Sequence, residues 1–300
     1  MSALKSKNSD AQLRVIIVIN VIILGLLFKV LWDNILSPDV AAANPGWIVS
    51  CQYSHSSKDD PIVSPGRTDA AHLHDFTGAR NTDAFSTSAT LKTGGSTCAI
   101  PGDTTAYWVP AMYKNGIRVL PNGTGKHTLF YYRRIAAPSG MTVRNIPDGL
   151  RMIVGNANAK SPSENTAITR GNIIFKCGPG STTDLSAPPQ QCGSGIMVVS
   201  YRFPNCWNGR DLDSPDHLSH MSYPISGKCP STHPVVIPRI ESFFRYNVGT
   251  APIGTITFSS GPFFTAHQDV LAAWKDTTIQ FLMDKCINAG VDCGTNPSAP

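Results

Sequence analysis

Eight cysteines constrain this chain more than any other feature, and all of them lie beyond residue 50. An even number of cysteines in an exported chain predicts a disulfide framework that ties a loop-rich fold together. The sequence contains no CxxC pair, which excludes zinc-ribbon and thioredoxin-type motifs. Pairing in sequential order is the simplest expectation, and it predicts four bonds: Cys51–Cys98, Cys177–Cys192, Cys206–Cys229 and Cys286–Cys293.

The N-terminal segment predicts export. Basic residues precede an apolar run, Val15–Trp32, which is just long enough to span a membrane and contains a single charge, Lys29. The run is either an uncleaved signal anchor or a signal peptide cleaved near the alanines at 41–43. The positive-inside rule places the N-terminus in the cytoplasm and the remainder outside. We therefore expect residues 1–43 to form a tail, a membrane or signal segment and a stalk, and residues 44–300 to form one exported domain.

Composition excludes several classes of protein. Hydrophobic residues make up 41% of the chain and charged residues 15%, which excludes a disordered chain and a coiled coil. The formal net charge of +5 is too small and too scattered to indicate nucleic-acid binding. Known motifs for α/β-hydrolases, zincins, P-loop proteins and nicotinamide-binding proteins are also missing from the sequence.

Short β-rich runs separated by turn residues predict a mainly β protein with a β-sandwich-like core, long loops and a C-terminal helix. The expected helix begins at Thr265, because Gln268 completes a capping box and apolar residues follow near helical spacing. His267 would then lie in the first helical turn. The expected strands are Trp47–Gln52, Thr104–Pro110, Ile117–Leu120, His127–Arg134, Leu150–Gly155, Asn172–Cys177, Ile196–Phe203, Val235–Tyr246 and Thr255–Ser259.

Histidines gather in two clusters that carry the candidate chemistry. Imidazole exchanges protons near neutral pH and is the commonest metal ligand in proteins. Adjacent aspartates orient imidazoles and raise their basicity. We expect both clusters to converge on one cavity, with these candidate catalytic residues: His72, His74, Asp75, Asp216, His217 and His220. The alternative is a pair of hydrogen-bonded His–Asp networks that brace irregular loops.

Four further residues are candidates for substrate contact. The aromatic faces of Trp108 and Trp207 would stack on sugar rings, although a buried tryptophan is commoner than an exposed platform. Asp213 and His267 would complete the polar lining of the site. If the clusters bind a divalent metal instead, its ligands would be His72, His74, His217 and His220. The sequence identifies neither the metal nor the presence of one.

Several ordered motifs resemble the exported domain of unknown function nineteen ninety-six family of fungi and actinobacteria. The segments that carry the resemblance are Trp47–Cys51, His72–Phe76, Tyr107–Pro110, Phe203–Trp207, Leu212–His217 with His220 and Met221, Cys229–Pro230 with His233–Pro234, and Pro238–Ile240. Members of that family often occur beside carbohydrate-binding or wall-associated modules. The resemblance therefore implies a glycan setting for this chain, without defining an activity.

The expected function is that of an exported enzyme that acts on a polysaccharide by hydrolysis or elimination through its His/Asp cluster. The expected partners are a cell-surface or extracellular glycan and, through the N-terminal segment, a membrane. The alternative is a non-catalytic protein, either metal-binding or associated with the cell surface or wall, that uses the same histidines.

Overall fold

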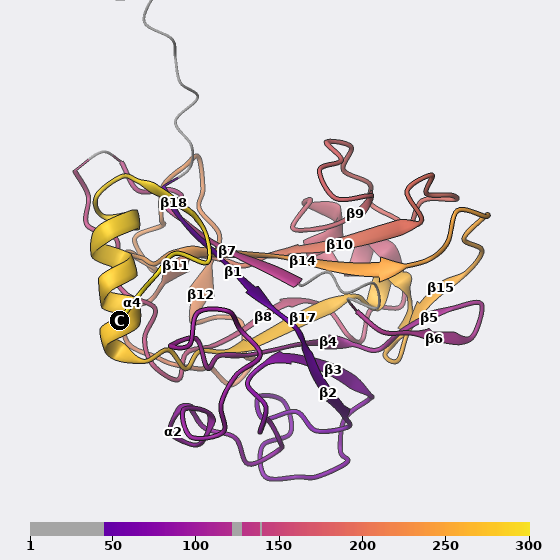
Figure 1. The fold of residues 1–300 in the computed structure, drawn as a ribbon, viewed down its shortest axis with the longest axis horizontal. Coiled ribbons are helices and arrows are strands. Elements are labelled where there is room, and N and C mark those ends of the chain that lie inside the picture. The colour runs from indigo at the N-terminus through magenta and orange to yellow at the C-terminus, as the bar shows by residue number, and fades with distance from the viewer. Residues whose placement is uncertain (1–44, 122–127, 139) are drawn as a thin grey trace, which may run out of the picture. The chain divides into compact units, whose positions relative to one another are not determined.

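Antiparallel strands dominate the computed structural model, which describes residues 45–121, 128–138 and 140–300. Two large sheets lie face to face, the six-stranded sheet above the five-stranded sheet in Figure 1. The mainly β, sandwich-like fold expected from the sequence is confirmed, as is the short C-terminal helix. The expected membrane or signal segment lies outside the described residues. Among the residues that are described, no helix has the length and apolarity needed to cross a membrane.

The six-stranded sheet has the order β18-β1-β7-β14-β10-β9. All its strands pair antiparallel except β18, which runs parallel to β1. Side chains alternate strictly along β14, where Ile240, Phe244 and Tyr246 are buried while Phe243 faces outward. The strands are β1 (Gly46–Cys51), β7 (Thr128–Arg133), β9 (Ile173–Cys177), β10 (Ile196–Arg202), β14 (Arg239–Asn247) and β18 (Asp292–Thr295).

The five-stranded sheet has the order β2-β3-β4-β17-β8 and is antiparallel throughout. Most of its strands are buried on both faces, because the six-stranded sheet covers one face and loops cover the other. The strands are β2 (Tyr53–Ser57), β3 (His74–Gly78), β4 (Ala106–Pro110), β8 (Arg151–Gly155) and β17 (His267–Leu271).

Two small sheets and a few short helices complete the fold. The four-stranded sheet contains β5 (Met112–Lys114), β6 (Ile117–Val119), β15 (Ile256–Phe258) and β16 (Gly261–Pro262), and the three-stranded sheet contains β11 (Cys206–Trp207), β12 (Met221–Ser222) and β13 (Val235–Val236). The helices are α2 (Ser88–Leu91), α3 (Thr166–Thr169) and α4 (Asp276–Leu282), which continues as the π-helical turn η4 (Met283–Ile287); the 3₁₀ turns are η2 (Pro162–Glu164) and η3 (Phe263–Thr265).

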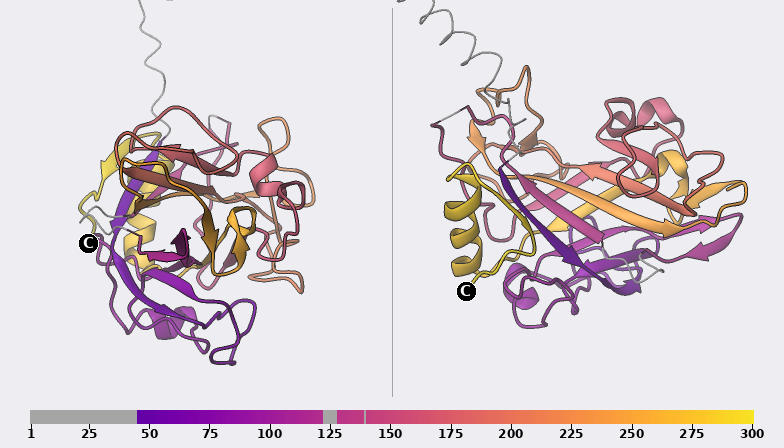
Figure 2. Two further views of the ribbon diagram at one scale, coloured as in Figure 1. Left: turned by 90° about the vertical axis from the view of Figure 1, so that its right-hand side faces the viewer. Right: turned by 45° about the horizontal axis from the view of Figure 1, so that its top comes forward.

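The main core lies between the two large sheets. Tyr107 of β4 stacks on Phe130 of β7 with ring centroids 3.7 Å apart, which joins the two layers directly. A second, smaller core lies on the outer face of the five-stranded sheet, where Phe76, Trp108 and Leu271 pack under Ile62 and Leu91. The segments that cover this face, residues 58–73 and 79–105, lie below the sheet in Figure 1 and on the same side in both views of Figure 2.

All four disulfides join the cysteines in sequential order, as expected. No cysteine of the described residues is free. Four disulfides are typical of extracellular proteins, because the cytosol keeps thiols reduced. The bonds therefore support export of the protein.

The structure corrects the prediction of a helix that begins at Thr265. Residues 267–271 form strand β17, and helix α4 begins only at Asp276. The apolar pattern was misleading because β17 is buried on both faces, so its side chains do not show the alternation of a half-exposed strand. As a consequence, His267 lies on a central strand of the five-stranded sheet and not in a helical turn.

A buried carboxyl between the sheets makes stability depend on pH. Asp103 accepts hydrogen bonds from the Tyr107 hydroxyl and the Thr105 amide, and burial raises its pKa from 3.8 to about 7. The unfolded chain releases this proton near its ordinary pKa, so the contribution to stability is full below about pH 4 and is lost as the pH rises through about 7. The loss amounts to at most about 4 kcal/mol.

The variant Asp103→Asn removes this titration while keeping the side-chain shape. We expect the unfolding free energy of the variant, relative to the native protein, to increase between about pH 4 and about pH 8. Urea unfolding at several pH values measures this difference. A difference that stays constant over that range would show that Asp103 is ionised in the folded protein.

Candidate functional site

Three imidazoles meet on the outer face of the five-stranded sheet. His74 begins β3, and His72 lies two residues before it with its ring against that of His74. His267 begins β17, two strands away. The Nε2 atoms of His72 and His267 are 3.1 Å apart, and the His72 and His74 ring centroids are 4.3 Å apart. His74 and His267 are buried, whereas His72 is half-buried.

Backbone carbonyls set the orientation of the two buried imidazoles. His74 donates from Nδ1 to the carbonyl oxygen of Asp59 at 3.0 Å, and His267 donates from Nδ1 to that of Thr265 at 2.9 Å. A neutral imidazole with a proton on Nδ1 carries a lone pair on Nε2. The Nε2 atom of His74 is buried and has no hydrogen-bond partner. Both rings therefore present lone pairs to the centre of the cluster.

Two buried carboxylates complete the cluster. Asp269 lies two residues after His267 on β17, with Oδ2 3.8 Å from His267 Nε2 and without a hydrogen-bond partner. Asp60 accepts the amides of Ile62 and Val63 through Oδ1, both at 2.8 Å. One ligand atom each of Asp60, His74 and Asp269 lies within 4.8 Å of the other two, as is also true of the three histidines.

Burial controls the charges of this cluster. It lowers the pKa of His72 to about 4 and that of His267 to about 3, and it lowers the pKa of His74 well below its usual value. Burial raises the pKa of Asp60, and burial together with the nearby Asp60 charge raises that of Asp269 strongly. At neutral pH the imidazoles are therefore neutral, and their lone pairs are available.

Gly155 allows β8 to approach the cluster closely. It pairs with His267 and has a φ of +105°, a conformation that favours glycine. A Cβ atom at this position would lie 2.3 Å from the carbonyl oxygen of Ala266 and 2.7 Å from Cα of His267. Any side chain here would therefore displace β17 and the imidazole that it carries.

A cavity of about 360 Å³ opens onto the cluster and brings in the second group of histidines. His217 lines it together with Asp60, and the Nδ1 atom of His217 lies 3.0 Å from Asp213 Oδ1. The φ of His217 is +56°, a left-handed conformation that bulky side chains seldom adopt. The Asp213 carboxylate thus accepts Nδ1–H and leaves Nε2 as the free atom of the His217 ring. The ionisable residues of the lining are Asp60, His72, Asp216, His217, His267 and Asp269.

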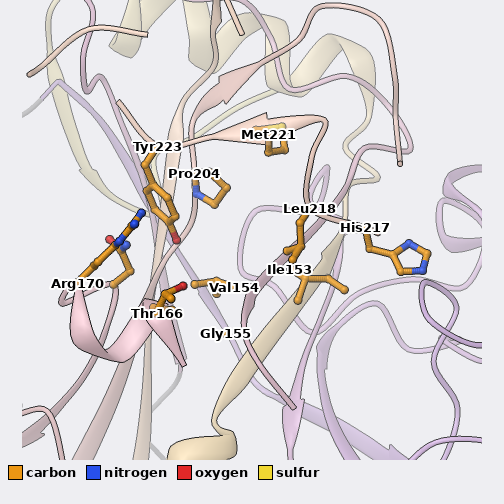
Figure 3. Close-up of a pocket in the computed structure, with 12 residues that line it drawn as sticks. Ile153, Val154, Gly155, Thr166, Arg170, Pro204, His217, Leu218, Met221 and Tyr223 are labelled. Atoms are coloured by element: carbon orange, nitrogen blue, oxygen red, sulfur yellow. The ribbon is translucent and has the colours of Figure 1, made fainter. Parts of the chain in front are cut away.

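A second cavity of about 190 Å³ lies beyond the His217–Leu218 segment. Both cavities share four lining residues, Ile153, Gly155, His217 and Leu218. Figure 3 shows the second cavity, with Arg170 and Tyr223 side by side and the His217 ring pointing away from them. The two cavities therefore form adjoining compartments on either side of one exposed leucine.

The structure separates some of the candidate catalytic residues. His72, Asp216 and His217 line the larger cavity, and His74 packs directly behind His72. Asp75 follows His74 in the strand and so faces the opposite side, where it pairs with Arg118 and Ser56. His220 uses both ring nitrogens elsewhere, on Ser214 Oγ and the Arg151 carbonyl. Asp75 and His220 thus lie away from the cavity and brace the surrounding structure.

The four residues expected to contact substrate lie in different parts of the structure. Trp108 is fully buried in the smaller core, which corrects its expected role as a sugar platform. Trp207 packs partly against the main core, and its indole donates to the Asp211 carbonyl. Asp213 lies behind His217 and orients it, whereas His267 lines the cavity. Asp216 is exposed and accepts the amides of Leu218 and Ser219, which lower its pKa.

Sequence reasoning missed Asp60 and Asp269. Asp269 follows His267 by two residues, a spacing that places both on one face of a strand, but the segment was interpreted as a helix. Asp60 lies in a loop with no motif that distinguishes it from the neighbouring Asp59. If residues 267–271 had been interpreted as a strand, the two-residue spacing from His267 would have identified Asp269 as a candidate.

The chain matches one known protein family, and the matched segment includes this site. A family model described as Domain of unknown function (DUF1996) matches residues 60–274, which is more than half of the chain. The chain belongs to this family. The DUF1996 match begins at Asp60 and includes every ionisable residue that lines the larger cavity. No curated protein and no solved structure matches the chain.

Proposed function

We propose that this DUF1996 protein is an exported enzyme that acts on a polysaccharide, by hydrolysis or elimination, at the larger cavity. The observation that carries the proposal is the position of His217, an imidazole oriented by Asp213 that lines one cavity together with Asp60, His72 and His267. The volume of the larger cavity falls within the range of about 300–1,000 Å³ that is typical of small-molecule sites.

The groups on the two sides of the cavity have complementary proton chemistry. With its Nδ1 proton bound by Asp213, His217 accepts a proton through Nε2 from a water molecule or from a sugar carbon. Burial raises the pKa of Asp60, which favours its protonated carboxyl, and this group can donate to a leaving oxygen. An acid and a base that line one cavity serve either hydrolysis or elimination.

An extended substrate is supported by the second cavity. The linings of the two compartments share Leu218, which is 48% exposed. Asn156, Asn158 and Ser64 supply hydrogen-bonding groups to the larger compartment, and Arg170 supplies a cation to the smaller one. Neighbouring compartments that each carry hydrogen-bonding groups suit consecutive sugar units of a chain better than a single small molecule.

A non-catalytic role at the cell surface is the second candidate. It is favoured by the lining of the larger cavity, which contains no tryptophan, tyrosine or phenylalanine on which a sugar ring could stack. Export to the cell surface is common to both candidates. We propose that Val15–Trp32 either anchors the protein in the membrane or directs its secretion.

A glycan-degradation screen tests the proposed activity. We expect the full-length exported protein to release reducing ends from one class of polysaccharide, with unsaturated products if the reaction is an elimination. Neutral glycans and uronate-containing glycans should be tested separately, because elimination requires an acidic C–H bond at a carbon next to a carboxyl group. Binding of a glycan without any product would favour the non-catalytic role, and neither binding nor product would contradict the proposal.

A further inference from the structure

The cluster around His74 contains more hydrogen-bond acceptors than donors. His74 and His267 each use their Nδ1 proton on a backbone carbonyl, so both Nε2 atoms are acceptors. Asp269 Oδ2 is a further buried acceptor, and neither it nor His74 Nε2 has a partner among the described residues. Leaving a buried polar atom unsatisfied costs about 1–3 kcal/mol. A cation at the centre would satisfy these acceptors together.

From this geometry we infer that His72, His74, His267 and Asp269 bind a divalent transition-metal ion at the inner end of the larger cavity. The inference goes beyond the proposed function, because it concerns metal binding alone and holds whether or not the substrate is a glycan. It also differs from the ligand set expected from the sequence, since His217 and His220 are replaced by His267 and Asp269.

The distances fit a tetrahedral ion. Nitrogen ligands about 2.05 Å from a tetrahedral zinc ion lie about 3.3 Å from each other. The Nε2 atoms of His72 and His267 are 3.1 Å apart, and Asp269 Oδ2 is 3.8 Å from His267 Nε2. One ligand atom from each of the three histidines lies within 4.8 Å of the others. Small side-chain rotations close the remaining gaps.

The support around the ligands is typical of metal sites. Metal-binding histidines almost always donate their second nitrogen to a carbonyl or carboxylate, which fixes the ring and its tautomer. His74 and His267 both do so. Asp60, held by the Ile62 and Val63 amides, adds a second buried carboxylate beside His74 and Asp269. The Asp269 carboxylate offsets part of the double charge of the ion.

A simple hydrogen bond between His72 and His267 explains their contact but not the remaining atoms. It requires His72 Nε2 to donate to the His267 lone pair, which leaves His74 Nε2 and Asp269 Oδ2 buried without partners. The ligand chemistry also selects the ion. Three imidazoles and one carboxylate suit zinc, cobalt or copper, whereas magnesium and calcium prefer oxygen ligands only.

Metal titration of the full-length protein tests the inference. After removal of metals with a chelator, we expect the protein to bind one equivalent of Zn²⁺ or Co²⁺, with the visible absorption of tetrahedral cobalt. The variants Asp269→Asn and His72→Ala should each weaken binding by more than about 100-fold, because loss of outer partners alone costs about 10–100-fold. Asp269→Asn preserves side-chain shape, and His72 is half-buried, so these changes disturb packing least.

The matched control is His55→Gln. His55 hydrogen-bonds to Ser54 and to the Thr82 carbonyl, and it belongs neither to the ligand set expected from the sequence nor to the one inferred from the structure. We expect it to bind metal like the native protein. Circular dichroism of the metal-free variants checks that they are folded. Native protein that binds less than a stoichiometric amount, or equal affinity in Asp269→Asn and native protein, would overturn the inference. Metal binding without glycan activity would leave it intact and count against the enzyme alone.

Discussion

Replacing His217 by asparagine should reduce the activity on the polysaccharide by about 10²–10⁴-fold, the usual contribution of a general base. Asparagine is the appropriate replacement because the φ of this residue is +56°, and asparagine tolerates that conformation better than most side chains. The loss should appear in kcat, since the imidazole acts on the reacting atoms and contributes little to substrate binding. Steady-state kinetics on the glycan identified by the screen measures the change.

Two further variants isolate the role of the His217 imidazole. Asp213→Asn keeps a polar partner at Nδ1 but removes the carboxylate that orients the ring, so it should lower kcat by a smaller factor. His233→Gln changes a half-buried histidine outside both cavities and should leave kcat unchanged. If His217→Asn retains full activity, the proton acceptor must be sought among His72 and His267 instead.

Replacing Trp108 by alanine should lower the free energy of unfolding by about 3–5 kcal/mol, as for other large aromatic side chains in protein cores. Trp108 is fully buried and packs with Phe76 and Leu271 under the loops that carry Asp60. Urea unfolding, followed by circular dichroism, measures the loss as a lower midpoint with an unchanged slope.

The comparison variant is Trp207→Ala, which removes a tryptophan that is only partly buried. Its loss of stability should be smaller than that of Trp108→Ala. If Trp108 instead served as a sugar platform, its replacement would raise KM at nearly unchanged stability. That result would require an opening to the indole that the described structure does not contain.

Local patterns in the sequence were sufficient for many of the strands and for the disulfides, and they predicted the export that the disulfides support. Several short β-rich runs correspond to strands of the large sheets, such as β7, β8 and β14, because a strand that is covered on one face leaves its alternation in the sequence. The cysteines pair in chain order. Motif order alone also indicated the family, which the match over residues 60–274 establishes.

The composition of the site was decided only by the tertiary structure. Strands β3 and β17 carry His74, His267 and Asp269, yet both are buried on two faces and therefore lack the alternation that identifies a strand. A third strand, β4, lies between them and sets their spacing. The sheet thereby brings together His72 and His267, which are almost two hundred positions apart in the sequence.

Side-chain direction separated neighbours that the sequence groups together. His74 and Asp75 are adjacent, but the pleat of β3 sends one to the histidine cluster and the other to Arg118. His217 and His220 share a segment, but only His217 faces the cavity, because His220 hydrogen-bonds to the backbone of β8. The sequence by itself determined which residue types were available for chemistry. Strand pairing and the alternation of side chains decided which of them share one cavity, because these depend on contacts between distant segments.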